Sequence, residues 1–77
     1  MDRVMVFLRT SLYSYGGRDA HIPPGVMVVE GSLVHENQGS IRVDADRFLD
    51  ERGRELLDEA MTMTIPWGKI DHVLIVV

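Results

Sequence analysis

Seventy-seven residues without a cysteine, carrying a net charge of −4, make one small domain that neither disulfides nor thiolate metal sites can stabilise. Twelve acidic residues against eight basic ones disfavour a dominant role in nucleic-acid binding, which depends on clustered Lys and Arg. No apolar run approaches the roughly 18 residues of a membrane span and no secretory leader is recognisable, so we expect a single cytoplasmic domain over residues 1–77 that has no membrane partner.

The chain begins with a predicted strand and a long loop. Arg3–Leu12 is an apolar run with β-branched and aromatic residues, which indicates a strand. Tyr13–Gly25 follows as a loop, because a Gly pair and a Pro-Pro-Gly triplet interrupt regular structure within it.

The next segments predict a β-hairpin. Val26–His35 indicates a second strand, in which Gly31 marks a bulge, a sharp bend or a close backbone approach. A turn follows at Asn37–Gly39. Ser40–Ala45 then alternates apolar and polar residues, which is typical of a strand with one buried face. We expect these two strands to pair.

The period changes in Asp46–Ala60, and this change predicts a helix. Apolar residues recur at spacings of four, three and four, with Asp46 as the N-cap; they are Leu49, Gly53, Leu56 and Ala60. An interior glycine costs a helix about 1 kcal/mol relative to alanine. The alternative is a tight turn at Glu51–Gly53 between two extended pieces.

The segment Thr62–Val77 predicts a closing β-hairpin, because two apolar runs flank the turn signal Pro66–Gly68. Its last strand is apolar on both faces. Such strands are normally covered on both sides, since an exposed one invites edge pairing. We therefore expect a homo-oligomer with Val73, Ile75 and Val76 at the interface.

Residues that could support catalysis or metal binding do not form a recognisable motif. The three histidines, His21, His35 and His72, fall on different predicted elements without metal-ligand spacing. The acidic residues of the predicted helix could supply an acid/base pair only in a desolvated cleft; they are Asp50, Glu51, Glu55, Asp58 and Glu59. We expect no enzyme activity, no metal and no cofactor.

Binding residues are expected around the Pro-Trp-Gly apex. Trp67 would project from this apex, with Lys69 beside it, and Tyr13 and Tyr15 on the long loop could join it. Trp and Tyr are favoured binding anchors, although a single Trp in a small fold also serves as a lid on the core. Asn37, in the turn of the predicted hairpin, completes the set.

The order of these elements resembles the Sm-like family of small β-barrels, which includes the LSm and Hfq proteins. Gly31-Ser32-Leu33 is similar to the Gly-x-Leu of the first Sm motif, and Asn37 stands where that motif carries Asp. Ile65, Ile70 and Val73 keep the apolar spacing of the second motif. The resemblance covers Val26–Val77 and implies a ring or other homo-oligomer in which the fourth strand of one subunit pairs with the fifth strand of the next.

The RNA-binding residues of this family do not match. Pro66-Trp67 stands where archaeal and eukaryotic Sm proteins carry their RNA-contacting Arg-Gly, and Ser40 or Ile41 stands in place of an Asn. The loop before Val26 is also wider than the tight turn of the family. The resemblance therefore implies assembly more directly than it implies RNA binding.

These observations predict a mainly β domain with one helix (α+β), a five-stranded Sm-like or SH3-like barrel with the helix inserted before the closing hairpin. The predicted function is a non-enzymatic, self-associating interaction module. An Sm-like RNA binder that stacks bases on aromatic side chains is the alternative. A metal-dependent enzyme built on His and carboxylates is disfavoured.

Overall fold

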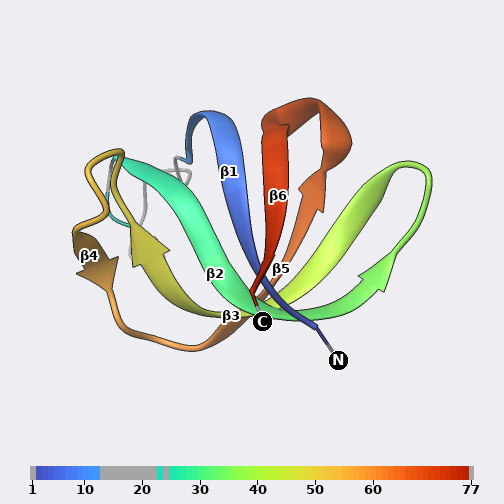
Figure 1. The fold of residues 1–77 in the computed structure, drawn as a ribbon, viewed down its shortest axis with the longest axis horizontal. Coiled ribbons are helices and arrows are strands. Elements are labelled where there is room, and N and C mark those ends of the chain that lie inside the picture. Colours follow the sequence, from blue (N-terminus) through green and yellow to red (C-terminus); the bar gives the residue numbers. More distant parts are fainter. Residues whose placement is uncertain (1, 13–22, 24, 77) are drawn as a thin grey trace.

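The computed structural model describes residues 2–12, 23 and 25–76 of the chain (Figure 1). Strands dominate it, and one 3-10 turn precedes the last strand. In chain order the elements are β1 (Arg3–Leu12), β2 (Val26–Glu36), β3 (Ser40–Leu49), β4 (Glu55–Leu57), β5 (Met61–Pro66), η1 (Trp67–Lys69) and β6 (Ile70–Val76).

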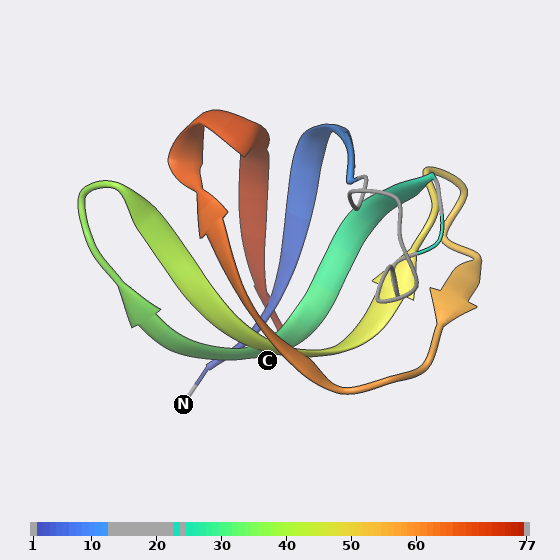
Figure 2. The same cartoon turned by 180° about the vertical axis from the view of Figure 1, so that it is seen from behind.

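All strands belong to one antiparallel sheet with the order β4-β3-β2-β1-β6. β5 also pairs with β3, over Ser40–Pro66 to Ala45–Met61, whereas β4 pairs with the other end of β3. The sheet curls strongly around its core, as the two opposite views show (Figures 1 and 2). It remains open, because among the described residues β5 pairs only with β3 and β6 only with β1.

Alternation in β1 builds the core. Val4, Val6 and Leu8 are buried on one face, called the inner face below, while the intervening Met5 and Phe7 lie on the outer face and are partly exposed. The inner face is completed by buried side chains from every long strand: Val29, Ile41, Val43, Ala45, Phe48, Ile65 and Ile70.

Gly31 lets β2 and β3 approach each other closely. A Cβ at this position would lie 2.1 Å from the carbonyl oxygen of Asp44 and 2.7 Å from the Cα of Ala45. The register between the two strands shifts on either side, between Glu30 and Gly31 and again between Leu33 and His35. The predicted hairpin is confirmed, and so is the close backbone approach at its glycine.

The predicted helix is wrong. Its first residues continue β3, and Phe48 enters the core with no exposed surface. The chain then turns at Glu51–Gly53, where Gly53 has a φ of +84°, a conformation that other residues adopt only with strain. The alternative of a tight turn between extended pieces is correct, since β4 follows at once. The domain is therefore nearly all β with an open antiparallel sheet, which overturns the α+β barrel with an inserted helix.

The carboxylate of Asp50 explains why this turn forms. Its Oδ1 accepts hydrogen bonds from the backbone N–H of Arg52 at 2.8 Å and of Arg54 at 2.9 Å. The backbone of the same residue also bonds with Arg54 and Gly53. An aspartate that binds nearby backbone N–H groups offers the chain an alternative to helix, and this side chain takes that alternative.

The closing hairpin is also corrected. Its two strands lie where they were expected, but they do not pair with each other; β5 adds to β3 and β6 adds to β1. The 3-10 turn Trp67–Lys69 redirects the chain after the extended Pro66, and because the sheet curls, β6 starts close to the end of β5 but pairs with β1 (Figures 1 and 2). No helix of the described residues is long and apolar enough to cross a membrane.

Candidate functional site

The free edge of β6 carries most of the exposed large apolar side chains. Leu74, Ile75 and Val76 are 50%, 60% and 39% exposed. β6 ends the sheet, since its pairing partner within the described part of the chain is β1 alone. This strand contains the three predicted interface residues; Leu74, in the same apolar run, belongs with them.

The apolar residues of β6 face both sides of the sheet. Leu74 lies opposite Met5, so its side chain lies on the outer face. Ile75 lies opposite Val4, and Val73 opposite Val6, so these two point to the inner face. The half-buried Val73 packs against the core, whereas the greater part of Ile75 is open to solvent.

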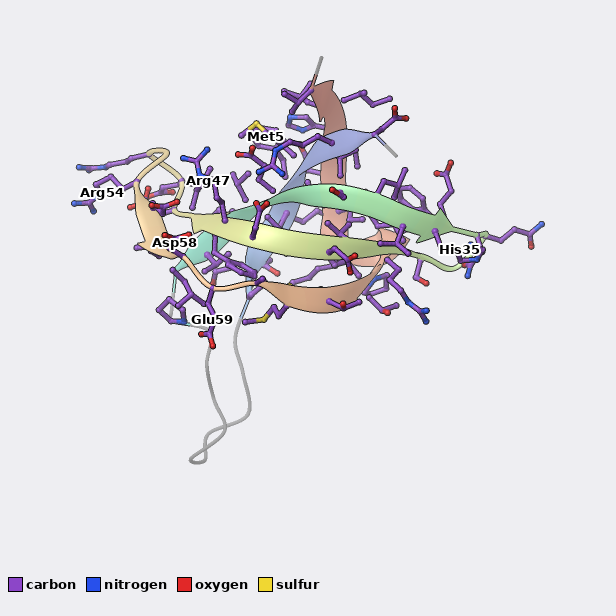
Figure 3. The ribbon with its side chains drawn as sticks, turned by 90° about the horizontal axis from the view of Figure 1, so that it is seen from below. Met5, His35, Arg47, Arg54, Asp58 and Glu59 are labelled. Atoms are coloured by element: carbon purple, nitrogen blue, oxygen red, sulfur yellow. The ribbon has the colours of Figure 1, made fainter. Side chains whose placement is uncertain are left out.

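His72 occupies the start of the outer row of β6. Its ring stacks on Phe7 with the ring centroids 4.3 Å apart, and its Nδ1 lies 2.7 Å from a carboxylate oxygen of Asp71. His35 lies at the far end of the β2–β3 hairpin, away from Arg54 and the β4 turn (Figure 3). His21 lies outside the described residues. Within those residues no group of three His, Cys, Asp or Glu could hold a metal ion.

A groove runs along the inner side of the β6 edge. It has a volume of about 360 Å³ and separates β6 from the β2–β3 hairpin, whose Leu33 and Ile41 contribute to it. Carboxylates accompany its apolar lining, from Asp2, Glu36 and Asp71. No pattern in the sequence marks these three residues as neighbours, because the bend of β2 and the crossing of β6 bring them together.

Trp67, which lines this groove, contacts Asn37 in the hairpin turn. The indole N–H of Trp67 donates to the backbone carbonyl of Asn37 at 2.7 Å, and its backbone N–H donates to Gly39 at 3.2 Å. The Asn37 side chain accepts from Gly39 and Ser40, which closes the hairpin turn. Trp67 is half-buried. One part of its side chain packs against the core and covers it, and Trp67 also lines the groove, where a ligand could reach it.

The other predicted binding residues do not join this pair. Lys69 points toward the end of β1, where its Nζ donates to Thr10 at 2.6 Å and to the carbonyl oxygen of Ser11 at 3.1 Å. Tyr13 and Tyr15 lie outside the described residues.

A network of charges crosses the outer face and was not predicted. Glu30, only 7% exposed, accepts from Arg3 at 2.9 Å and from Arg47 at 3.0 Å. Arg3 also binds both carboxylate oxygens of Asp46, and Arg47 binds Glu55. The hydrogen bonds from Arg3 lower the pKa of Asp46 below its ordinary value. These pairs tie β1, β2, β3 and β4 together, so the network is structural.

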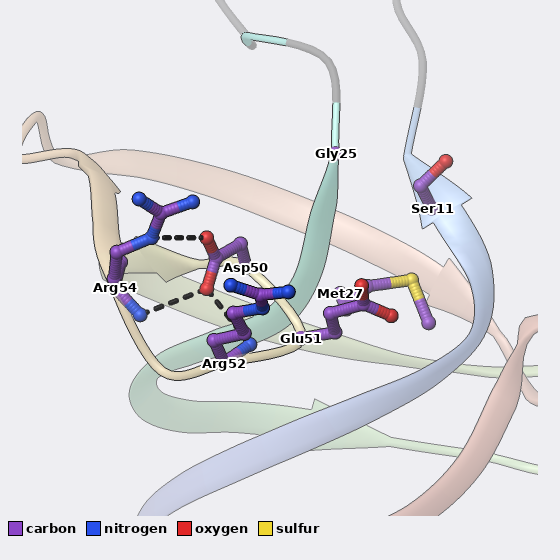
Figure 4. Close-up of a pocket in the computed structure, with 7 residues that line it drawn as sticks. All are labelled: Ser11, Gly25, Met27, Asp50, Glu51, Arg52 and Arg54. Carbon is purple, nitrogen blue, oxygen red and sulfur yellow. Dashed lines mark hydrogen bonds and ion pairs between the residues drawn. The ribbon is translucent and has the colours of Figure 1, made fainter.

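A second cavity, of about 550 Å³, lies beside the β4 turn (Figure 4). Asp50 is one of the residues that line it. The Asp50 carboxylate accepts hydrogen bonds from both the backbone N–H and the guanidinium of Arg54. The backbone hydrogen bond from Arg54 is the main cause that lowers the pKa of Asp50. A carboxylate held in its charged form by such contacts is a poor general acid.

Comparison with known proteins assigns no family to the chain, so its function is inferred from the geometry of its surfaces. No family model, curated protein or solved structure matches the chain. The edge of β6, which carries three of the four exposed large apolar side chains of the described residues, and the groove beside it are the candidate binding surfaces.

Proposed function

We propose that this protein is a non-enzymatic interaction module that associates with copies of itself through β6. The observation that carries the proposal is the exposure of Leu74, Ile75 and Val76 on a strand with a free edge. Soluble proteins protect edge strands with charges, prolines or bulges. β6 has none of these from Val73 to Val76, so a second copy is the cover that we expect.

The energy available from this contact is substantial for a small domain. Fully burying a Val, Leu or Ile side chain contributes about 1.5–3 kcal/mol. Because these three are already about half covered, completing their burial contributes about 2–4 kcal/mol per copy. The whole domain is expected to be stable by about 4–12 kcal/mol.

The Sm-like resemblance suggests how the copies would join. In that family the fourth and fifth strands pair across the subunit boundary, and their counterparts here are β5 and β6. Both have a single pairing partner in the described part of the chain, which supports this arrangement. Pairing would bring β5, with its half-buried Met61 and Met63, against the edge of β6 in the next copy.

Light scattering on the purified chain tests self-association. At micromolar concentration we expect a mass that is a multiple of 8.7 kDa and a thermal midpoint that rises with protein concentration. Val76→Lys should shift the protein toward the monomer, because the lysine charge would have to be buried at the contact.

Val34→Lys is the matched control. Val34 is 40% exposed, as Val76 is at 39%, but it lies on β2, which pairs with β1 and β3 and not with β6 among the described residues, and it does not line the groove. The control should leave the mass unchanged. A monodisperse monomer whose melting temperature does not depend on concentration would contradict self-association.

An Sm-like RNA binder is the second candidate. The contact between Asn37 and Trp67 favours it, since these residues stand in the two Sm motifs and lie together here. The net charge of −4 and the carboxylates beside Trp67 disfavour it, because phosphates are bound by Lys and Arg.

A further inference from the structure

The groove between β6 and the β2–β3 hairpin has the dimensions of a site for an extended chain. Asp71, His72, Val73 and Ile75 of β6 line one side, and the five-residue stretch that contains them spans about 16 Å. Val4, Ile41 and Trp67 also line the groove. Its lining is therefore mainly apolar.

The backbone along one wall of the groove is able to pair. β6 has β1 as its partner on one side, and its other edge is unpaired among the described residues. A segment that enters the groove can add to this edge as a further strand, so that main-chain hydrogen bonds supply affinity and alternate side chains supply specificity.

The charges around the groove select the occupant. Asp2, Glu36 and Asp71 contribute carboxylates, and no Lys or Arg is among its described lining residues. His72 also lines the groove, and its Nδ1 lies 2.7 Å from a carboxylate oxygen of Asp71. Carboxylates gathered around a concave, apolar surface focus a negative potential there. That potential attracts Lys and Arg and repels the phosphates of a nucleic acid.

A second copy of the chain does not supply this complement. Its free-edge strands, β5 (Met61–Pro66) and β6 (Ile70–Val76), contain neither Lys nor Arg, and the chain as a whole is acidic. The groove therefore favours a different protein, although copies of this chain can compete for the same edge.

We propose that the groove binds an extended segment of a partner protein in which apolar residues alternate with Lys or Arg. The apolar side chains enter between Ile75 and Leu33, and the basic ones meet the three carboxylates. The proposal rests on the role of β6 as an interaction strand. It adds the chemical class of the partner.

The probe is the synthetic heptapeptide acetyl-Ile-Arg-Val-Lys-Val-Arg-Ile-amide. Two matched peptides accompany it, one with Glu at the three basic positions and one with Ser at the four apolar positions. Trp67 is the only tryptophan and lines the groove, so its fluorescence reports occupancy directly. Titrations use the unmodified protein, and light scattering on the same samples gives its mass, so that a change in self-association is distinguished from peptide binding.

We expect the basic apolar peptide to bind at least about tenfold tighter than either matched peptide. Only this peptide has both basic side chains for the three carboxylates and apolar side chains for the apolar lining of the groove. The triple variant Asp2→Asn, Glu36→Gln, Asp71→Asn should weaken it by about tenfold or more. A control triple, Glu51→Gln, Asp58→Asn, Glu59→Gln, removes the same charge outside the groove and should change Kd by less than about twofold.

Three results would overturn the proposal. One is no saturable change in Trp67 fluorescence at peptide concentrations up to about 1 mM. Another is equal weakening by the two triple variants, which would mean that only bulk charge attracts the peptide. The third is tighter binding of oligouridine than of the peptide in the same titration, which would make the occupant a nucleic acid. A monomeric unmodified chain would contradict self-association and leave each of these readouts intact.

Discussion

Replacing Gly31 with alanine tests the close contact on which the bend of β2 depends. The added Cβ would lie 2.1 Å from the Asp44 carbonyl oxygen, whereas carbon and oxygen atoms of adjacent strands approach to about 3.3–3.6 Å. The two strands would therefore have to separate by more than about 1 Å at this point. The obstacle is backbone on both sides, so no side chain can rotate away to relieve it.

The expected cost combines two terms. Overpacking in a filled interior costs about 1–3 kcal/mol, and each hydrogen bond weakened between Gly31 and its β3 neighbours adds about 1 kcal/mol. We expect Gly31→Ala to lower the free energy of unfolding by about 3–4 kcal/mol, a large share of the total for this domain.

Urea denaturation followed by Trp67 fluorescence measures this change, with Gly39→Ala as the control. A Cβ at Gly39 would meet only the Asn37 side chain, at an ordinary 3.6 Å, so the control should stay within about 0.5 kcal/mol of the unmodified protein. A Gly31→Ala protein within about 1 kcal/mol of the original, with an unchanged denaturant slope, would refute the close approach of β2 and β3.

Three further predictions address the turn, the acid range and nucleic acid. Gly53→Ala should destabilise the fold by about 1–2 kcal/mol, because φ is +84° at this position and no packing contact of the added methyl group offsets the strain. If urea denaturation instead shows a more stable variant, the helix over Asp46–Ala60 is the better description of this segment. Asp46 and Asp50 have lowered pKa values, so their stabilisation is complete above about pH 4 and is lost as the pH falls through those lowered values. Thermal melts from about pH 6 to about pH 2 should therefore show an acid loss of stability that Asp46→Asn or Asp50→Asn reduces. Oligouridine should bind no tighter than about 10⁻⁴ M at physiological salt, and a sub-micromolar complex that Trp67→Ala weakens would instead support the RNA-binding candidate.

Local patterns predicted the strands whose partners are close in sequence. Arg3–Leu12 is a strand over the predicted range, because its apolar residues alternate into a core. The hairpin of β2 and β3 followed from the turn at Asn37–Gly39 and from the alternation after it. In these segments the local preference and the final fold agree, so a period of two was enough to identify them.

The helix failed because two periods fit the same residues. The apolar positions around Gly53 recur as a helix requires, yet Phe48 belongs to the core face of β3 and Leu57 lies opposite it on β4. The turn contacts of Asp50 and the positive φ of Gly53 decided the outcome. A single glycine in a charged segment is compatible with either structure, and only pairing with the rest of the sheet distinguishes them.

The groove could not be predicted because it depends on long-range pairing. A strand-turn-strand sequence suggests a hairpin, but β6 leaves β5 and joins β1, which sets it against the far end of β2. That pairing brings Asp71, Asp2 and Glu36 to the same groove, although the three are far apart in the chain.

By contrast, the unusual exposure of β6 was predictable: Val73 to Val76 is apolar throughout, and a strand has two faces. One sheet can bury at most one of them, and at this edge Ile75 is 60% exposed even on the inner face. Both faces of the strand therefore meet solvent or a partner, and the free edge gives that partner a backbone with which to pair.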